Sequence, residues 1–253
     1  MTSFEYHIDR PKYPKKKNPL LVYLHGYGEN FNRLSVKTKS SLPGCIEDFP
    51  ILQNFTIVTP FSPRGFWWNV EDLIQFIQRI IVIERDIDIS RISLCGISMG
   101  GYAAWALMSK FPNCFSAVVP ICGGSNPFDR FITLPFRWDE FDRTNFKTNK
   151  YTSVWAFHGR LDLVVPVYET TRNIKILQKN GNNNCKQTLF WAGHRIFNRV
   201  FKNGDMYKWI YKQQLPPAIV QQSLFFNLVN VAQPFEKIDT LVEVYSASQT
   251  QKV

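Results

Sequence analysis

The serine at position 98 lies at the centre of Gly96-Ile97-Ser98-Met99-Gly100, a segment with the spacing G-x-S-x-G. An apolar run, 92–95, precedes this segment, and a helix-forming stretch, 103–108, follows it. This order predicts a strand, a sharp turn and a helix. The serine hydroxyl would be exposed at the turn, with glycines where side chains would collide with the strand and the helix. The segment predicts a nucleophilic serine; a glycine-rich turn without chemistry is the alternative.

A serine hydroxyl needs a general base, and imidazole accepts and returns a proton near neutral pH. Four histidines are available. His7 lies in the amino-terminal segment, whereas His25 and His158 each precede a glycine at the end of an apolar run, where we expect them to hold loop backbones. His194 follows the last apolar run. Triads built on such a turn have the chain order serine, acid, histidine. Only His194 leaves room for an acid after Ser98, so we predict that it is the base.

The acid is expected in the loop after the apolar run 154–157. Asp162 lies there, in His158-Gly159-Arg160-Leu161-Asp162. Its carboxylate would fix the tautomer of His194 and stabilise the imidazolium. An aspartate that only forms a turn is the alternative. The aspartates within 125–150 are less well placed, because they lie inside an insertion.

Acyl transfer also needs donors for the negative oxygen of the tetrahedral intermediate. One should be the backbone N–H of Met99, directly after the serine, and the other the N–H of Tyr27, in the loop after the first apolar run. Gly26 and Gly28 would allow the close backbone approach that such a loop requires.

Short apolar runs alternate with stretches of helical spacing along most of the chain. This alternation predicts an α/β protein with a mostly parallel sheet and helices on both faces. Active sites of such sheets lie at the carboxyl ends of the strands, which is where Ser98, Asp162 and His194 are found. Residues 1–18 are expected to be irregular. The predicted strands are 20–24, 57–60, 92–95, 117–121, 154–157 and 188–191, and the predicted helices are 72–83, 103–108, 168–178 and 206–211.

The chain is expected to divide into a hydrolase domain, 1–215, and a carboxyl-terminal extension, 216–253. An aromatic-rich insertion, 125–150, would be either a lid or substrate wall, or a packed surface loop. In the extension Val220, Leu224, Leu228 and Val231 share one face of a helix. We expect that face to dock on the domain; a protein partner or a membrane surface is the alternative.

Composition narrows the class of protein. The 253 residues are 45% apolar, enough for the core of one large domain. A net charge of +10 favours anionic surfaces or substrates. No zinc-finger, RNA-binding or basic-helix signature occurs, so nucleic acid is not expected as a partner. No stretch approaches the roughly 20 apolar residues of a transmembrane helix.

The five cysteines lack C-x-x-C and metal-ligand spacing. They predict free core thiols, with no metal site and no cofactor. The amino terminus lacks the basic region and apolar core of a secretory signal. Together these features favour a cytosolic or organellar location.

Several segments resemble the α/β-hydrolase esterases of the phospholipase/carboxylesterase and dienelactone-hydrolase-like group, and within it the predicted peptidase/esterase branch. The matching segments are 20–29, 89–102, 111–124, 154–166 and 192–194. The resemblance implies the α/β-hydrolase fold over about residues 18–212. One departure concerns the residues after His194, where Arg195 stands in place of the small or acidic residue common in relatives.

The resemblance also implies roles for individual residues. Ser98, Asp162 and His194 would form the triad. Tyr27 and Met99 would take the oxyanion positions, and Trp67 or Trp68 would lie beside the acyl pocket.

These residues together predict a metal-independent serine hydrolase that cleaves carboxylic esters or thioesters of small molecules through an acyl-enzyme on Ser98. A serine peptidase on the same triad is one alternative. A non-catalytic hydrolase-fold subunit of a larger assembly, with the extension as its contact, is the other.

Overall fold

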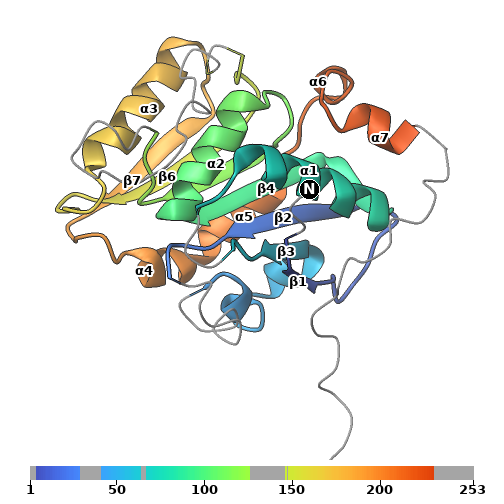
Figure 1. Ribbon diagram of the computed structural model, residues 1–253, viewed down its shortest axis with the longest axis horizontal. Helices are drawn as coiled ribbons and strands as arrows, with labels where there is room; N and C mark the ends of the chain where they lie inside the picture. Colours follow the sequence, from blue (N-terminus) through green and yellow to red (C-terminus); the bar gives the residue numbers. More distant parts are fainter. Residues whose placement is uncertain (1–3, 29–40, 64–66, 126–145, 147, 231–253) are drawn as a thin grey trace, which may run out of the picture.

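Seven strands form one sheet in the order β1-β3-β2-β4-β5-β6-β7 (Figure 1). The computed structural model describes residues 4–28, 41–63, 67–125, 146 and 148–230. Strands β2 to β7 run parallel, and β1 pairs antiparallel with β3 at one edge. The strands are β1 Tyr6–Asp9, β2 Asn18–Leu24, β3 Thr56–Pro60, β4 Ile87–Ile97, β5 Ala117–Ile121, β6 Ser153–Gly159 and β7 Cys185–Phe190.

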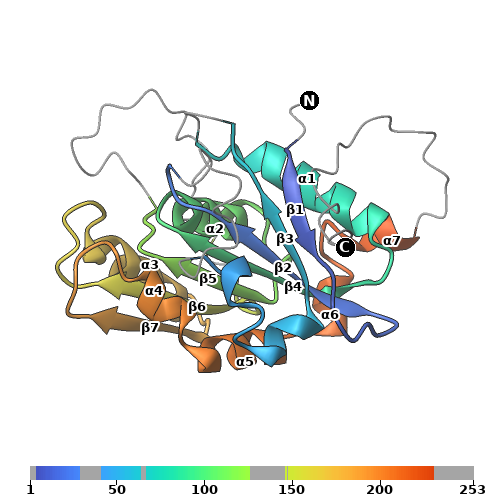
Figure 2. The ribbon, with the colours of Figure 1, turned by 90° about the horizontal axis from the view of Figure 1, so that it is seen from below.

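Helices cover both faces of this sheet, as the two ribbon views show (Figure 1, Figure 2). One face carries α1 Val70–Ile83, α2 Met99–Lys110 and α3 Val167–Lys179. The other carries α4 Phe197–Phe201, α5 Gly204–Lys212 and the short 3-10 helices η3 Pro43–Cys45 and η4 Pro50–Asn54. The predicted α/β class, with a mostly parallel sheet between helices, is confirmed.

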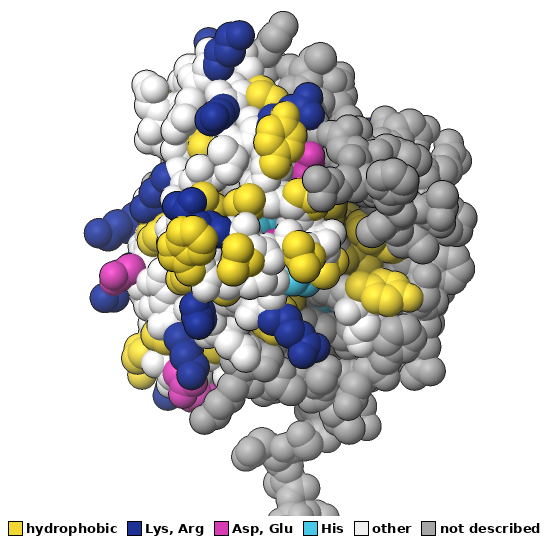
Figure 3. Space-filling model, turned by 90° about the vertical axis from the view of Figure 1, so that its left-hand side faces the viewer, with side chains coloured by type: hydrophobic (Ala, Val, Ile, Leu, Met, Phe, Trp, Pro, Cys, Tyr) yellow, Lys and Arg dark blue, Asp and Glu magenta, His cyan; other side chains and the backbone are white. Residues whose placement is uncertain are grey.

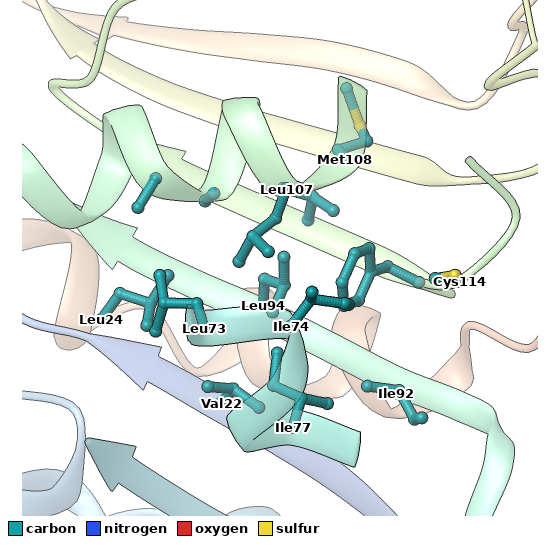
Figure 4. Close-up of a cluster of buried hydrophobic side chains, with 14 of the residues drawn as sticks. Val22, Leu24, Leu73, Ile74, Ile77, Ile92, Leu94, Leu107, Met108 and Cys114 are labelled. Atoms are coloured by element: carbon teal, nitrogen blue, oxygen red, sulfur yellow. The ribbon is translucent and has the colours of Figure 1, made fainter. Parts of the chain in front are cut away.

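Alternation along the buried strands creates the two halves of the core. Successive side chains of a strand point to opposite faces of the sheet. Leu20, Val22 and Leu24 of β2 accordingly pack toward α1 and α2, while Leu21 and Tyr23 pack toward α5. Figure 4 shows side chains of β2, β4, α1 and α2 meeting in the first of these clusters. A strand that is buried on both faces consists of consecutive apolar residues, which is why β2 could be predicted from the sequence.

The sequence predicted an irregular amino-terminal segment. In the structure this segment contains strand β1. This strand pairs Tyr6 with Pro60 and Asp9 with Ile57 of β3. Rings of Phe4 and Tyr6 contact Phe76 of α1, with centroids 5.8 and 5.4 Å apart. Four residues that include a histidine and an aspartate are too short and too polar for a strand signal. Packing on α1 is what orders them.

The described part of the extension contains two separate short helices, α6 Pro217–Val220 and α7 Phe226–Asn230. The single helical face expected over 220–231 is therefore wrong, and Leu224 is exposed. Phe225 is fully buried, 6.1 Å from the ring of Phe115, and Leu228 packs on the same core cluster. The described part thus docks on the domain, as expected. The division at residue 215 stays a prediction, and Val231 lies outside the described residues.

All five cysteines are buried and none forms a disulfide. The expectation of free core thiols is therefore correct. Within the described residues, no helix combines the length and hydrophobicity that crossing a bilayer requires.

Candidate active site

Ser98 stands in the tight turn that joins β4 to α2, with φ 50° and ψ −111°. A positive φ is strained for a residue with a side chain, and such strain concentrates at functional sites. The flanking glycines are sterically required. A β-carbon on Gly96 would lie 2.1 Å from the carbonyl oxygen of Gly100, and one on Gly100 would lie 2.0 Å from that of Leu24. The sequence pattern thus corresponds to a real packing constraint.

The structure brings Ser98, His194 and Asp162 together at the carboxyl ends of β4, β7 and β6. Nε2 of His194 lies 2.9 Å from Oγ of Ser98, and Nδ1 lies 2.7 Å from Oδ2 of Asp162. A carboxylate can only accept, so Nδ1 carries the hydrogen and Nε2 accepts from the serine hydroxyl. This tautomer is the one that a general base needs.

The Asp162 side chain is buried and is held by several donors, although other residues of its loop are exposed. Its Oδ1 accepts from the backbone N–H groups of Val164 and Val165, at 2.9 and 2.8 Å. Burial by itself would raise the pKa of the carboxyl. Hydrogen bonds from His158, His194 and the Val165 N–H outweigh that effect and hold the pKa well below its ordinary value. Asp162 is therefore ionised across the neutral range and faces His194 as a carboxylate.

His158 is a second imidazole in contact with this carboxylate. Its Nε2 lies 2.9 Å from the carbonyl of Val165 and 3.2 Å from Oδ2 of Asp162, and its Nδ1 lies 2.7 Å from Oγ1 of Thr170. Since both neighbours of Nε2 are acceptors, Nε2 carries the hydrogen, whereas Oγ1 of Thr170 donates to the carbonyl of Gly123 at 3.2 Å. We expected His158 to hold a loop backbone, which its bond to Val165 does. Its contact with Asp162 was missed, although the i, i+4 spacing of the two residues was visible.

Cys122, His158 and Asp162 bring atoms of metal-ligand type within 4.8 Å of one another. Each atom is already bonded within the protein. Burial, reinforced by the nearby Asp162 charge, raises the pKa of the Cys122 thiol to about 12. The sulfur is thus a neutral thiol, which donates to the carbonyl of His194 at 3.2 Å rather than acting as a thiolate ligand. The three residues support the loops of the triad.

The predicted oxyanion donors lie on two neighbouring turns. Met99 is the first residue of α2, where backbone N–H groups have no partner within the helix. Tyr27 lies in the turn after β2, beside Gly28, whose φ is 88°. Leu24 of β2 is paired with Gly96 of β4, so this turn adjoins the serine turn. The assignment of the two N–H groups remains a prediction that this proximity supports.

His25 supports the turn after β2. Its Nδ1 donates to the carbonyl of Gly26 at 2.8 Å, and its Nε2 accepts from the N–H of Ser62 at 3.1 Å. Burial lowers its pKa to about 4, the bond to Gly26 opposing this in part. The ring is therefore neutral and holds two loop backbones, in agreement with the expectation.

The two tryptophans predicted beside the acyl pocket differ in position. Trp68 is buried, with its indole N–H donating to the carbonyl of His25 at 3.2 Å, so it supports the loop that carries Tyr27. Trp67 is half-buried and its ring lies 5.6 Å from that of Tyr102, one helical turn after Ser98. Trp67 is the better placed of the two for a substrate. Most of the predicted insertion, 126–145 and 147, lies outside the described residues.

Comparison with known proteins identifies the family of the chain. Residues 67–213 match the prolyl oligopeptidase family, a segment that includes Ser98, Asp162 and His194. The chain is also similar to the bifunctional acetylxylan esterase/xylanase XynS20E of Neocallimastix patriciarum, at 29% identity over 130 residues. That match covers 49% of this chain and 18% of the other protein, so the chain spans less than a fifth of its relative.

Solved structures share the fold. A thermostable esterase superposes with a TM-score of 0.64 at 24% identity, over 83% of this chain and 58% of the esterase. The acylaminoacyl peptidase of Pyrococcus horikoshii superposes with a TM-score of 0.60 at 15% identity, over 83% of this chain and 39% of the peptidase. The predicted resemblance to α/β-hydrolase esterases, and the predicted α/β-hydrolase fold, are confirmed.

Proposed function

The chain belongs to the prolyl oligopeptidase family, and on that premise we propose that it is a serine hydrolase that cleaves carboxylic esters or thioesters through an acyl-enzyme on Ser98. The observation that carries the proposal is the pair of contacts, 2.9 and 2.7 Å, that link Ser98 through His194 to Asp162. All three residues lie within the family match, and the similar proteins include esterases.

The geometry supports the following sequence of steps. Oγ of Ser98 attacks the substrate carbonyl while its proton passes to Nε2 of His194. Asp162 stabilises the resulting imidazolium through the Nδ1–H bond. His194 then gives the proton to the departing alcohol or thiol, which leaves an acyl group on Ser98. Water, deprotonated by the same imidazole, releases the acid and restores the serine.

Negative charge develops on the carbonyl oxygen during both halves of the reaction. We propose that the N–H groups of Met99 and Tyr27 receive it. Removal of one such donor typically costs about 3 kcal/mol of transition-state stabilisation. The start of α2 adds its dipole, whose positive end favours an anion beside Ser98.

An active-site probe tests the proposal directly. A fluorophosphonate should label the folded wild-type protein and should not label Ser98→Ala. The two proteins are then compared on p-nitrophenyl esters and acyl thioesters of increasing chain length, with hydrolysis expected only for the wild type. If the folded wild type neither reacts with the probe nor hydrolyses any of these substrates, the proposal is wrong, and a non-catalytic subunit becomes the better description.

A serine peptidase on the same triad is the second candidate. The family match and the likeness to an acylaminoacyl peptidase favour it, and the triad by itself does not distinguish an amide from an ester. Parallel assays on N-acylated peptides and on esters of the same acyl group separate the two. Faster turnover of the peptides, relative to their uncatalysed hydrolysis, would favour the peptidase.

A further inference from the structure

Large apolar side chains are concentrated on the surface around the triad. Ten are exposed in the described part of the chain, and six of these lie at the carboxyl edge of the sheet, five on loops and Tyr168 in the first turn of α3. Leu163 is 98% exposed and Trp191 is 76% exposed. We call these six residues the apolar rim: Tyr27, Leu161, Leu163, Val164, Tyr168 and Trp191. Contiguous exposed apolar surface on a folded domain marks an interaction site.

Five of the six residues of the apolar rim, all except Tyr27, lie in a segment whose exposed charges are all positive. Residues 160–199 contain seven lysines and arginines and two acids, and both acids, Asp162 and Glu169, are buried. The guanidinium of Arg160 lies over the ring of Trp191, 5.3 Å from its centroid, and Arg195 is exposed next to His194. Figure 3 shows this face, with hydrophobic side chains around histidine at the centre, and with lysines and arginines and fewer acidic side chains at their margin.

Two loops of the apolar rim, those after β6 and β7, are joined to each other and carry Asp162 and His194. The N–H of Leu161 donates to the carbonyl of Ala192 at 3.0 Å, and that of Arg160 donates to Phe190 at 2.8 Å. These bonds hold the loop after β6 against the loop after β7. Asp162 and His194 belong to the same two loops. Whatever binds the apolar rim therefore lies beside Asp162 and His194.

We propose that the apolar rim and its arginines bind an anionic lipid surface. Leu163 is almost fully exposed on a loop, so a fluid acyl phase fits it without a complementary pocket. Tryptophan and tyrosine beside arginine are the side chains that favour the boundary between acyl chains and headgroups, where aromatic rings bury and cations reach anionic groups. A second copy of the chain fits less well, because a symmetric contact through this face would bring like charges together.

This binding goes beyond the hydrolase chemistry and does not depend on it. Lipid association requires the surface residues alone, so Ser98→Ala should bind as the wild type does. Docked in this way, the protein would present Ser98 and His194 to the lipid phase, and an ester carried by an amphiphile would reach them without crossing water.

Sedimentation of the full chain with vesicles tests the proposal. We expect binding to vesicles of phosphatidylcholine mixed with phosphatidylserine, much weaker binding to phosphatidylcholine alone, and weakening of the former by salt. Leu163→Ser should reduce the partition coefficient about tenfold, the loss of one buried leucine side chain. The double variant Arg160→Ala, Arg195→Ala should reduce it roughly fivefold for each arginine.

Matched controls distinguish this face from a general attraction of a basic protein. Ile83→Ser removes an exposed apolar side chain from the end of α1, and Lys12→Ala with Lys16→Ala removes two cations before β2, at the opposite edge of the sheet. Both should bind nearly as the wild type does. The proposal is overturned if folded wild type does not sediment with the anionic vesicles or if the controls lose as much binding. Self-association that Leu163→Ser abolishes, without vesicle binding, would overturn it in favour of a second copy.

Discussion

The dipeptide His-Gly occurs directly after strand β2 and again at the end of strand β6, yet the two sites are built differently. His25, after β2, bonds to the Gly26 carbonyl and the Ser62 N–H, and so connects two backbones. His158, at the end of β6, bonds to a backbone carbonyl and also faces the carboxylate of Asp162. The same two residue types thus support a loop at one site and a charged group at the other.

The glycines that follow the two histidines also differ in how closely other segments of the chain approach them. A β-carbon on Gly26 would meet only Ile97, at an ordinary contact distance of 3.4 Å. A β-carbon on Gly159 would lie 2.2 Å from the carbonyl oxygen of Gly193, in the loop that carries His194. A motif at a strand end thus acquires its role from the loop that returns to it. At β6 that loop brings His194, the proposed base, to Asp162, the proposed acid.

The proposed acid of the triad, Asp162, lies at the β6 end, and removing its charge should have the largest effect. Asp162→Asn is expected to lower kcat roughly 10⁴-fold, because the amide neither stabilises the imidazolium nor fixes the tautomer of His194. Ester hydrolysis measures this change. Asp205→Asn, an exposed aspartate on α5, is the control and should leave kcat unchanged. A loss of less than about tenfold in Asp162→Asn would assign the acid elsewhere.

Alanine at the two glycines tests the steric difference. Gly159→Ala should destabilise the fold by more than about 3 kcal/mol, because the clash is with backbone and displaces the loop of His194. Gly26→Ala should change the free energy of unfolding by less than about 1 kcal/mol. Urea unfolding of both variants gives the two values. Equal losses would mean that the strand ends are packed alike.

The pH dependence of stability tests the neutral state of His25. Its pKa is about 4 in the folded protein, against an ordinary value of 6.5. As the pH falls below about 6.5 the unfolded chain takes up a proton that the folded chain does not, so stability decreases until about pH 4, by up to about 3 kcal/mol. His25→Gln should reduce this slope when urea unfolding is followed across that range. An unchanged slope would argue that another group titrates there.

The contact of His158 with Asp162 predicts the smallest effect. His158→Leu removes one donor from Oδ2 of Asp162, and with it part of the support that orients this carboxylate toward His194. We expect kcat for ester hydrolysis to fall roughly tenfold, with KM unchanged. His158→Gln, which retains an N–H donor, should recover most of the loss. If His158→Gln is impaired as much as His158→Leu, the bond to Asp162 does not matter for the reaction.

Much of the fold could be predicted because its strands are buried on both faces. The runs in β2, β3 and β5 are continuous and apolar, so periodicity located them, and the helices between them imposed a parallel order. β1 could not be predicted, since four residues at a sheet edge, half of them polar, carry no such signal. The extension was read as one helix because Val220 and Leu228 have helical spacing, whereas the chain bends between α6 and α7 to bury Phe225.

The candidate triad could be predicted from the sequence for a different reason. Its three members lie in loops whose chain order is constrained, and glycines mark the close approaches that their strand ends require. The contact between His158 and Asp162 could not be predicted from the sequence, because it depends on how the chain turns back after β6. That turn is closed by the N–H groups of Val164 and Val165 on Oδ1 of Asp162, and no periodicity records it.

The buried cysteines allow local unfolding of the protein to be measured. Burial raises the pKa of Cys114 and of Cys185 to about 11, so in the closed protein almost no sulfur is present in the nucleophilic, ionised form that alkylating reagents attack. Iodoacetamide added at neutral pH would therefore modify these sulfurs only when a segment of the chain swings out into water. The rate of alkylation at each cysteine then measures how often the segment that carries it opens, without any engineered label.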